Sequence, residues 1–126
     1  MINDFLGMAQ HNDLGKQGEL IAQKYLEDKG YKILETNWQY SHAEIDILAQ
    51  KDDILAVIEV KTRTSDYYGK PEMFVSKKKI NLLKNAANYY VKMNNLDVEI
   101  RFDIIAIIKN QYVEEIEHLE DAFLWF

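Results

Sequence analysis

Two strand-like stretches separated by a pair of aspartates constrain the fold of this chain most strongly. Residues 44–51 (EIDILAQK) and 54–62 (ILAVIEVKT) are rich in branched apolar side chains, and Asp52 and Asp53 lie between them. This pattern predicts a β-hairpin. A turn of two or four residues gives one and the same register, in which residue i faces residue 105 − i. Because residues two apart on a strand share a face, the register also predicts which side chains lie together.

Four charged side chains lie on the two strands away from the turn. The register places Asp46 opposite Glu59, and Glu44 opposite Lys61. Two carboxylates about 5 Å apart repel each other by roughly 3 kcal/mol at an effective dielectric constant of about 20. A held proton, a neighbouring cation such as Lys61 or a bound metal ion relieves this repulsion. The alternative is an ordinary solvated strand face, or charges that only set the strand register.

The rest of the chain alternates between helical and strand-like patterns. The expected elements are a helix over 12–29, a strand over 31–38, the hairpin, a loop over 63–73, a helix over 76–93, and strands over 98–108 and 111–119. Asn12 or Asp13 is expected to cap the first helix, Gly30 to end it, and Ser76 to cap the second. This order predicts a mixed α/β domain, residues 12–126, preceded by a loose segment, residues 1–11.

Bulk properties exclude several classes of protein. A chain of 126 residues is long enough for one hydrophobic core. The absence of cysteine excludes disulfides and thiolate zinc sites. No apolar run approaches the roughly 18 residues of a membrane span. The N-terminus also lacks the basic region of a signal peptide, so a cytoplasmic protein with no membrane partner is expected.

Basic residues are concentrated in one part of an acidic chain. The net charge of −6 argues against a nucleic-acid partner, yet residues 61–84 carry seven basic and two acidic side chains. Lys77, Lys78 and Lys79 occupy the first turn of the second helix, where the helix dipole favours acidic residues. Such local conflicts are typical of functional sites, and this helix end suits a phosphate group. The alternative is a solvated run of lysines.

The hairpin motif resembles a known signature. The residues EID (44–46) and IEVKTR (58–63) resemble the D…E-x-K motif of the restriction-endonuclease-like, or PD-(D/E)XK, superfamily. From about Leu14 onward the chain resembles the YraN-like family of small bacterial predicted nucleases. The matching stretches are residues 15–34, 43–49, 57–63, 77–90, 101–107 and 116–123. The resemblance implies a mixed central sheet of about five strands flanked by helices, as in archaeal Holliday-junction resolvases.

The resemblance also implies roles for individual residues. Asp46 and Glu59 match acids that bind Mg²⁺ or Mn²⁺, Lys61 matches the catalytic lysine, and Glu19 matches an acid that joins the metal site. Glu44 either binds metal or pairs with Lys61, and we favour the pair. The residues expected to hold phosphate groups are Arg63, Lys70, Lys77, Lys78 and Lys79.

The expected function is therefore a metal-dependent endonuclease that acts on DNA rather than RNA. Because its basic residues would contact phosphates and not bases, we expect selectivity for branched or junction DNA. One alternative is a non-catalytic nucleic-acid-binding module that acts with a DNA-processing partner. Another is a structural protein.

Two features of the sequence allow more than one interpretation. Ala43 stands where the family usually has glycine, which matters if that position needs a positive φ. The apolar tail, residues 122–126, either packs on the core, which we favour, or forms a homodimer interface.

Overall fold

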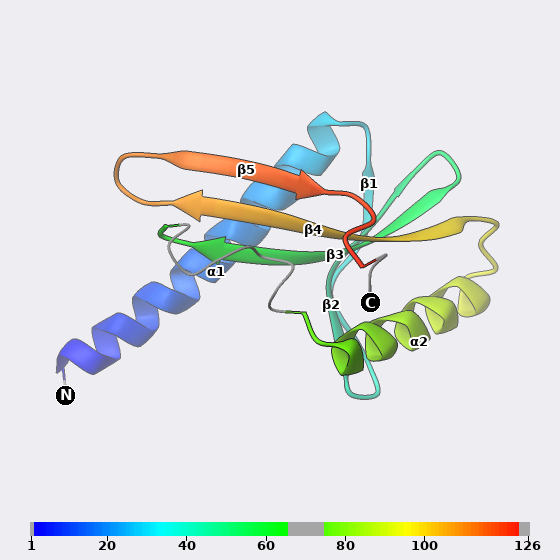
Figure 1. The fold of residues 1–126 in the computed structure, drawn as a ribbon, viewed down its shortest axis with the longest axis horizontal. Helices are drawn as coiled ribbons and strands as arrows, with labels where there is room; N and C mark the ends of the chain where they lie inside the picture. Colours follow the sequence, from blue (N-terminus) through cyan, green and yellow to red (C-terminus); the bar gives the residue numbers. More distant parts are fainter. Residues whose placement is uncertain (1, 66–74, 124–126) are drawn as a thin grey trace.

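One five-stranded sheet organises the molecule. The structure is a computed structural model that describes residues 2–65 and 75–123, with side chains described from Asp13 onward in the first helix. The sheet order is β1-β2-β3-β4-β5, with β3 and β4 parallel and all other neighbours antiparallel (Figure 1). The elements are α1 (Ile2–Asp28), β1 (Lys32–Tyr40), β2 (Ala43–Lys51), β3 (Ile54–Arg63), α2 (Lys77–Met93), β4 (Glu99–Lys109) and β5 (Glu114–Leu119). The expected α/β class and element order are confirmed.

The β2–β3 hairpin has the predicted register over part of its length. Pairs run from Lys51 and Ile54 at the turn to Ile47 and Ile58, and each pair obeys the predicted relation. Asp52 adopts a φ of 54°, which aspartate tolerates in tight turns. The ladder ends at Ile47 and Ile58, so the pairing predicted beyond that point is not formed.

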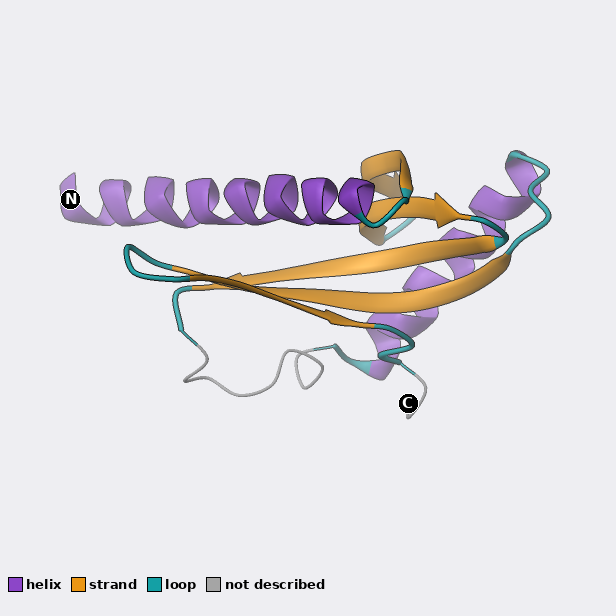
Figure 2. Ribbon diagram, turned by 90° about the horizontal axis from the view of Figure 1, so that it is seen from above, coloured by secondary structure: helices purple, strands orange, loops and turns teal. Residues whose placement is uncertain are grey.

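The two helices cover opposite faces of the sheet (Figure 2). Side chains of β3 alternate between two cores, as the two-residue period of a strand requires. Leu55 and Val57 pack in the core that contains α2. Ala56 and Ile58 pack in the core that contains Ala22 and Leu26 of α1. The odd-numbered face of β3 therefore looks toward α2, and this is the face that carries Glu59.

Helix α1 begins earlier than predicted and lies very close to β3. It starts at Ile2, so the predicted start at Asn12 or Asp13 is wrong; residues 2–12 contain no proline that would stop the helix. At Gly18 a Cβ atom would lie 1.8 Å from Thr62 Oγ1, so only glycine allows this approach. The predicted end is confirmed to within one residue, because α1 ends at Asp28 and Gly30 adopts a φ of 96° two residues later.

Helix α2 begins as predicted. The Lys79 backbone N–H donates to Ser76 Oγ at 3.1 Å, and no acidic residue lies in the first turn. Val75 and Ile80 are buried in the same core, as expected of a hydrophobic staple. The core also contains Phe123, which stacks on Phe102, in agreement with the favoured packing of the tail. The last three residues lie outside the described part of the chain.

None of the described helices is long and apolar enough to span a bilayer.

Candidate functional site

Glu59 is a buried carboxylate held between two lysines. It is 6% exposed on the α2-facing side of β3. Its Oε1 atom accepts a hydrogen bond from Lys79 Nζ in the first turn of α2 and lies 3.6 Å from Lys61 Nζ on its own strand. Glu59 and Lys61 therefore lie together on one face of β3, as the two-residue spacing predicts.

Asp46 lies where the β2–β3 ladder ends. Its Oδ2 atom accepts a hydrogen bond of 2.8 Å from the backbone N–H of Val60, two residues beyond the last paired residue of β3, Ile58. The predicted direct pair of Asp46 and Glu59 is therefore replaced by a side-chain contact with the neighbouring residue. The two carboxylates still lie close enough to repel each other.

The surroundings of Asp46 disfavour its negative charge. Burial of the side chain and then repulsion from Glu59 raise the pKa of Asp46 to about 7, with a smaller contribution from Glu19. The Val60 hydrogen bond and the charge of Lys79 act in the opposite direction but do not cancel the increase in this pKa. The site therefore favours either a bound proton or an added positive charge.

Asp46 and Glu59 line one pocket of about 470 Å³, which we call the acidic pocket. It lies between the start of β2 and the first two turns of α2. Its lining residues are His42, Ala43, Glu44, Asp46, Glu59, Lys79, Leu82 and Leu83. Ala43 is absent from the residues with positive φ, so alanine is accommodated there without backbone strain.

Glu19 approaches the same region from α1. It follows Gly18, whose close contact with Thr62 brings the helix onto β3. Its Oε2 atom accepts a hydrogen bond of 3.2 Å from the amide of Asn37, which has a φ of 49° within β1. Glu19 acts on Asp46 through its charge but is absent from the lining of the acidic pocket.

The predicted pair of Glu44 and Lys61 is wrong. Glu44 is exposed and accepts a hydrogen bond of 3.4 Å from the amide of Gln39 on β1, whereas Lys61 lies beside Glu59. The reason is the early end of the ladder at Ile47 and Ile58, because Glu44 and Lys61 oppose each other only if the ladder continues. Glu44 nevertheless lines the acidic pocket.

The fit to a metal ion rests on two carboxylates. Among the described side chains, no group of three or more acidic or histidine residues is arranged to hold a metal ion. The carboxylates of Asp46 and Glu59, which share the acidic pocket, are hard oxygen donors of the kind that Mg²⁺ and Mn²⁺ accept. One oxygen of Glu59 already carries the Lys79 ammonium, so a cation bound there would replace that contact.

The basic residues divide into separate groups. Lys77 and Lys78 are exposed at the start of α2, whereas Lys79 turns inward to Glu59. Arg63 is half-buried at the end of β3, beyond Lys61. Lys70 lies outside the described residues.

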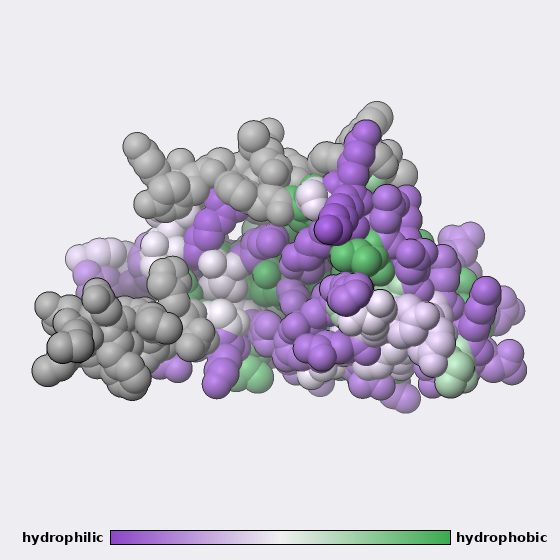
Figure 3. Space-filling model, turned by 90° about the horizontal axis from the view of Figure 1, so that it is seen from below, coloured by the Kyte–Doolittle hydropathy of each residue, from purple (hydrophilic) through white to green (hydrophobic). Residues whose placement is uncertain are grey.

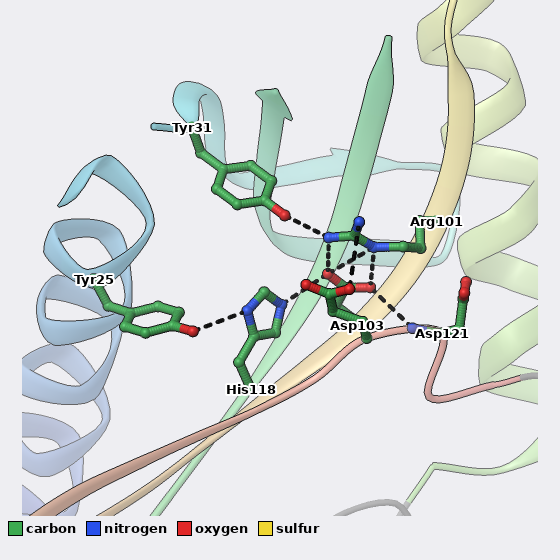
Figure 4. Close-up of polar contacts among 7 residues, drawn as sticks. Tyr25, Tyr31, Arg101, Asp103, His118 and Asp121 are labelled. Carbon is green, nitrogen blue, oxygen red and sulfur yellow. Dashed lines mark hydrogen bonds and ion pairs between the residues drawn. The ribbon is translucent and has the colours of Figure 1, made fainter. Parts of the chain in front are cut away.

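A second charged cluster lies on the α1 side of the sheet (Figure 4). Asp103 is fully buried and accepts hydrogen bonds from Arg101 and from His118 Nε2, each at 2.8 Å. The hydroxyl of Tyr31 contacts Arg101, and the hydroxyl of Tyr25 contacts His118. Burial alone would raise the pKa of Asp103, but the hydrogen bonds from His118 and Arg101 hold it below its ordinary value. The cluster joins β4 and β5 to α1 and to the start of β1.

Sequence reasoning missed three features of these clusters. Nothing in the run of three lysines distinguishes Lys79, which turns inward, from its two exposed neighbours. The contact of Asn37 with Glu19 depends on tertiary structure. The pair Arg101 and Asp103 did have a signal, because the two charges stand two apart in an apolar strand just as Glu59 and Lys61 do.

Comparisons with known proteins place the chain in a family. A family model described as an uncharacterised protein family, UPF0102, matches residues 18–107. A UPF0102 protein of Flavobacterium psychrophilum is 57% identical over 119 residues, which cover 94% of this chain and 100% of the relative. A UPF0102 protein of Bacteroides thetaiotaomicron is 44% identical over 116 residues, which cover 92% of this chain and 96% of the relative. The chain therefore belongs to the UPF0102 family, the YraN family.

Proposed function

We propose that the protein is a metal-dependent nuclease that hydrolyses phosphodiester bonds in DNA. The observation that carries the proposal is the acidic pocket, in which Asp46 and the buried Glu59 share one cavity with a lysine ammonium. Burial of two neighbouring carboxylates is costly without a cation. A pocket that keeps them beside each other therefore suits a ligand that brings positive charge.

Asp46 and Glu59 would hold a Mg²⁺ or Mn²⁺ ion, with Glu19, whose charge acts on Asp46, as a further acid. Such an ion supplies a more acidic bound water and polarises a phosphate group. Lys61, 3.6 Å from Glu59, would stabilise the negative charge that develops on that phosphate. The exposed Lys77 and Lys78, together with Arg63 and Lys70, would hold neighbouring phosphates along the strand.

The substrate proposal follows from the kind of contact available. Lysines at a helix N-terminus bind phosphate oxygens and carry no base information. We therefore propose selection by nucleic-acid structure, with branched or junction DNA as the substrate class. A homodimer would suit a two-fold substrate such as a four-way junction, and sedimentation of the protein alone and with junction DNA tests it.

A cleavage assay tests this function. Labelled junction, flap, duplex and single-stranded DNA are incubated with Mn²⁺ and with wild type, Glu59→Gln, Lys61→Ala and the control Lys84→Ala, in which an exposed lysine of α2 is changed. We expect cleavage by wild type and the control and a loss of at least about 100-fold in both site variants. Equal activity in all four proteins, or activity in none, would sink the proposal.

A second candidate function is nucleic-acid binding without catalysis. It is favoured by the pairing of Glu59 with Lys79 and Lys61, which neutralises this acid without a metal ion. A binding module of this kind would act with a DNA-processing partner. It predicts salt-dependent DNA binding that survives Asp46→Ala, and no cleavage of any substrate in the panel.

A further inference from the structure

A second cavity lies beside the acidic pocket along α2. Its volume is about 500 Å³, within the range of roughly 300–1,000 Å³ that is usual for small-ligand sites. The two cavities share Leu82. We call the second one the aromatic cavity; the lining residues that matter here are Tyr40, Tyr89, Asn85, Asn88 and Lys92.

Stacked rings form one wall of this cavity. Tyr40 of β1 and Tyr89 of α2 are stacked with centroids 4.1 Å apart and planes 16° apart. Trp38 lies beside this pair, with its ring centroid 6.2 Å from that of Tyr40 and 6.5 Å from that of Tyr89. Tyr89 is 38% exposed although it takes part in this stack. A flat, partly accessible ring of this kind accepts another flat ring.

The polar groups around the rings suit one class of ligand. Asn85 and Asn88 carry amides that both donate and accept hydrogen bonds, as the edge of a nucleobase requires. Lys92 adds a positive charge at the end of α2. Within the described part of the chain, these three side chains form no hydrogen bond or ion pair of their own.

The aromatic cavity and the acidic pocket are neighbours along α2, because Leu82 lines both. Lys79, Leu82, Tyr89 and Lys92 form a stripe that winds partly around the helix and has a lysine at each end. At about 1.5 Å per residue, the stripe is roughly 20 Å long. Seen from the side on which α2 lies, the described surface is mainly hydrophilic with small hydrophobic areas between (Figure 3).

We propose that the aromatic cavity binds an unpaired nucleobase of a nucleic-acid strand whose phosphates run along α2 toward the acidic pocket. The inference rests on the proposed function and names its substrate class: DNA that has unpaired nucleotides near the cleaved bond. A base within a duplex is stacked on both sides and cannot enter, so the cavity selects flaps, gaps and loops. Tyr89 stacks on the base, the two amides contact its edge, and Lys92 holds a phosphate.

Binding measured without cleavage tests this proposal. Fluorescence anisotropy in EDTA compares a labelled single strand, the same strand with abasic sites and the matching duplex. The proteins are wild type, Tyr89→Ala, Tyr89→Phe and Tyr112→Ala; Tyr112 is a matched control because it is 84% exposed on the β4–β5 turn. Circular dichroism checks that each variant is folded.

We expect Tyr89→Ala to weaken single-strand binding by roughly 5- to 150-fold, the range for loss of one stacked base. Tyr89→Phe keeps the ring and the affinity, Tyr112→Ala has no effect, and abasic sites remove the difference between wild type and Tyr89→Ala. The salt dependence of binding stays the same in Tyr89→Ala, because no phosphate contact is removed. Duplex affinity also stays the same.

Three results overturn the inference, and the third overturns the proposed function as well. The cavity does not hold a base if Tyr89→Ala binds the single strand as tightly as wild type. The same conclusion follows if Tyr89→Ala loses as much affinity for the duplex as for the single strand. A cavity that binds a peptide instead of a base would give the first of these results. The proposed nuclease function survives either result. If wild type binds no DNA at all, the inference and the proposed function fail together.

Discussion

Asp46 and Glu59 differ in how the protein deals with their charge, although both are carboxylates in the same pocket. Glu59 has two ammonium groups close by, whereas the described partner of Asp46 is a backbone N–H. The consequence is that the pKa of Asp46 rises to about 7, first through burial and then through repulsion from Glu59. At the scale of single residues, the positive charge of the lysines therefore balances the carboxylate of Glu59 but not that of Asp46.

Asp46→Asn should stabilise the protein in a pH-dependent way. Because the pKa of Asp46 is raised from 3.8 to about 7, the folded protein holds a proton that the unfolded chain releases, so wild type loses stability as pH rises between these values. The variant lacks this loss and keeps an acceptor for the Val60 N–H. Urea unfolding should show a larger gain at pH 8 than at pH 5. An equal gain at both values would mean that Asp46 ionises normally.

Lys79→Gln should weaken the protein and strengthen its response to Mn²⁺. Removing the ammonium leaves the buried Glu59 with Lys61 alone, at a cost of about 1–3 kcal/mol in EDTA. With no ammonium to compete, Mn²⁺ should raise the melting temperature of the variant more than that of wild type. The control is Lys78→Gln, an exposed neighbour expected to change stability by less than about 0.5 kcal/mol. Identical behaviour of the two variants contradicts the assignment.

At the scale of elements, close packing of α1 on β3 brings Glu19 toward the site. Gly18 allows this close packing, because Thr62 fills the space that a side chain at position 18 would need. The Arg101–Asp103 cluster acts on the same face in another way, since it joins β4 and β5 to α1 through Tyr25 and His118. One contact is steric and the other is electrostatic, and both hold the first helix in place.

Gly18→Ala and Gly15→Ala should have opposite effects. Alanine favours a helix over glycine by about 1 kcal/mol, and at Gly15 no atom lies within 4 Å of the added Cβ, so that variant should gain stability. At Gly18 the Cβ would lie 1.8 Å from Thr62 Oγ1, and overpacking should cost about 1–3 kcal/mol net. Urea unfolding of the two variants measures this. A gain at both positions would show that α1 does not pack closely on β3.

At the scale of the whole molecule, the sequence predicted the order of the elements and part of the hairpin register, but not the start of α1 or the contacts between residues distant in the chain. The alternation of β3 predicted that Glu59 and Lys61 share a face, and an even turn predicted the pairs up to Ile47 and Ile58. The end of the ladder depends on how β2 and β3 separate, which no local pattern encodes. Because local patterns do not encode such contacts, the predicted partner of Glu44 was wrong and the contact of Lys79 with Glu59 was not predicted.

The central claim is that Asp46 and Glu59 together hold a divalent cation, and calorimetric titration with Mn²⁺ tests it most directly. Wild type, Asp46→Asn, Glu59→Gln and the control Asp97→Asn, an exposed acid outside the acidic pocket, are titrated at pH 8. We predict one site in wild type and the control, and a loss of affinity of at least about tenfold in each of the other two. Equal Mn²⁺ affinity in all four proteins, or no binding by wild type even with DNA present, would contradict the account.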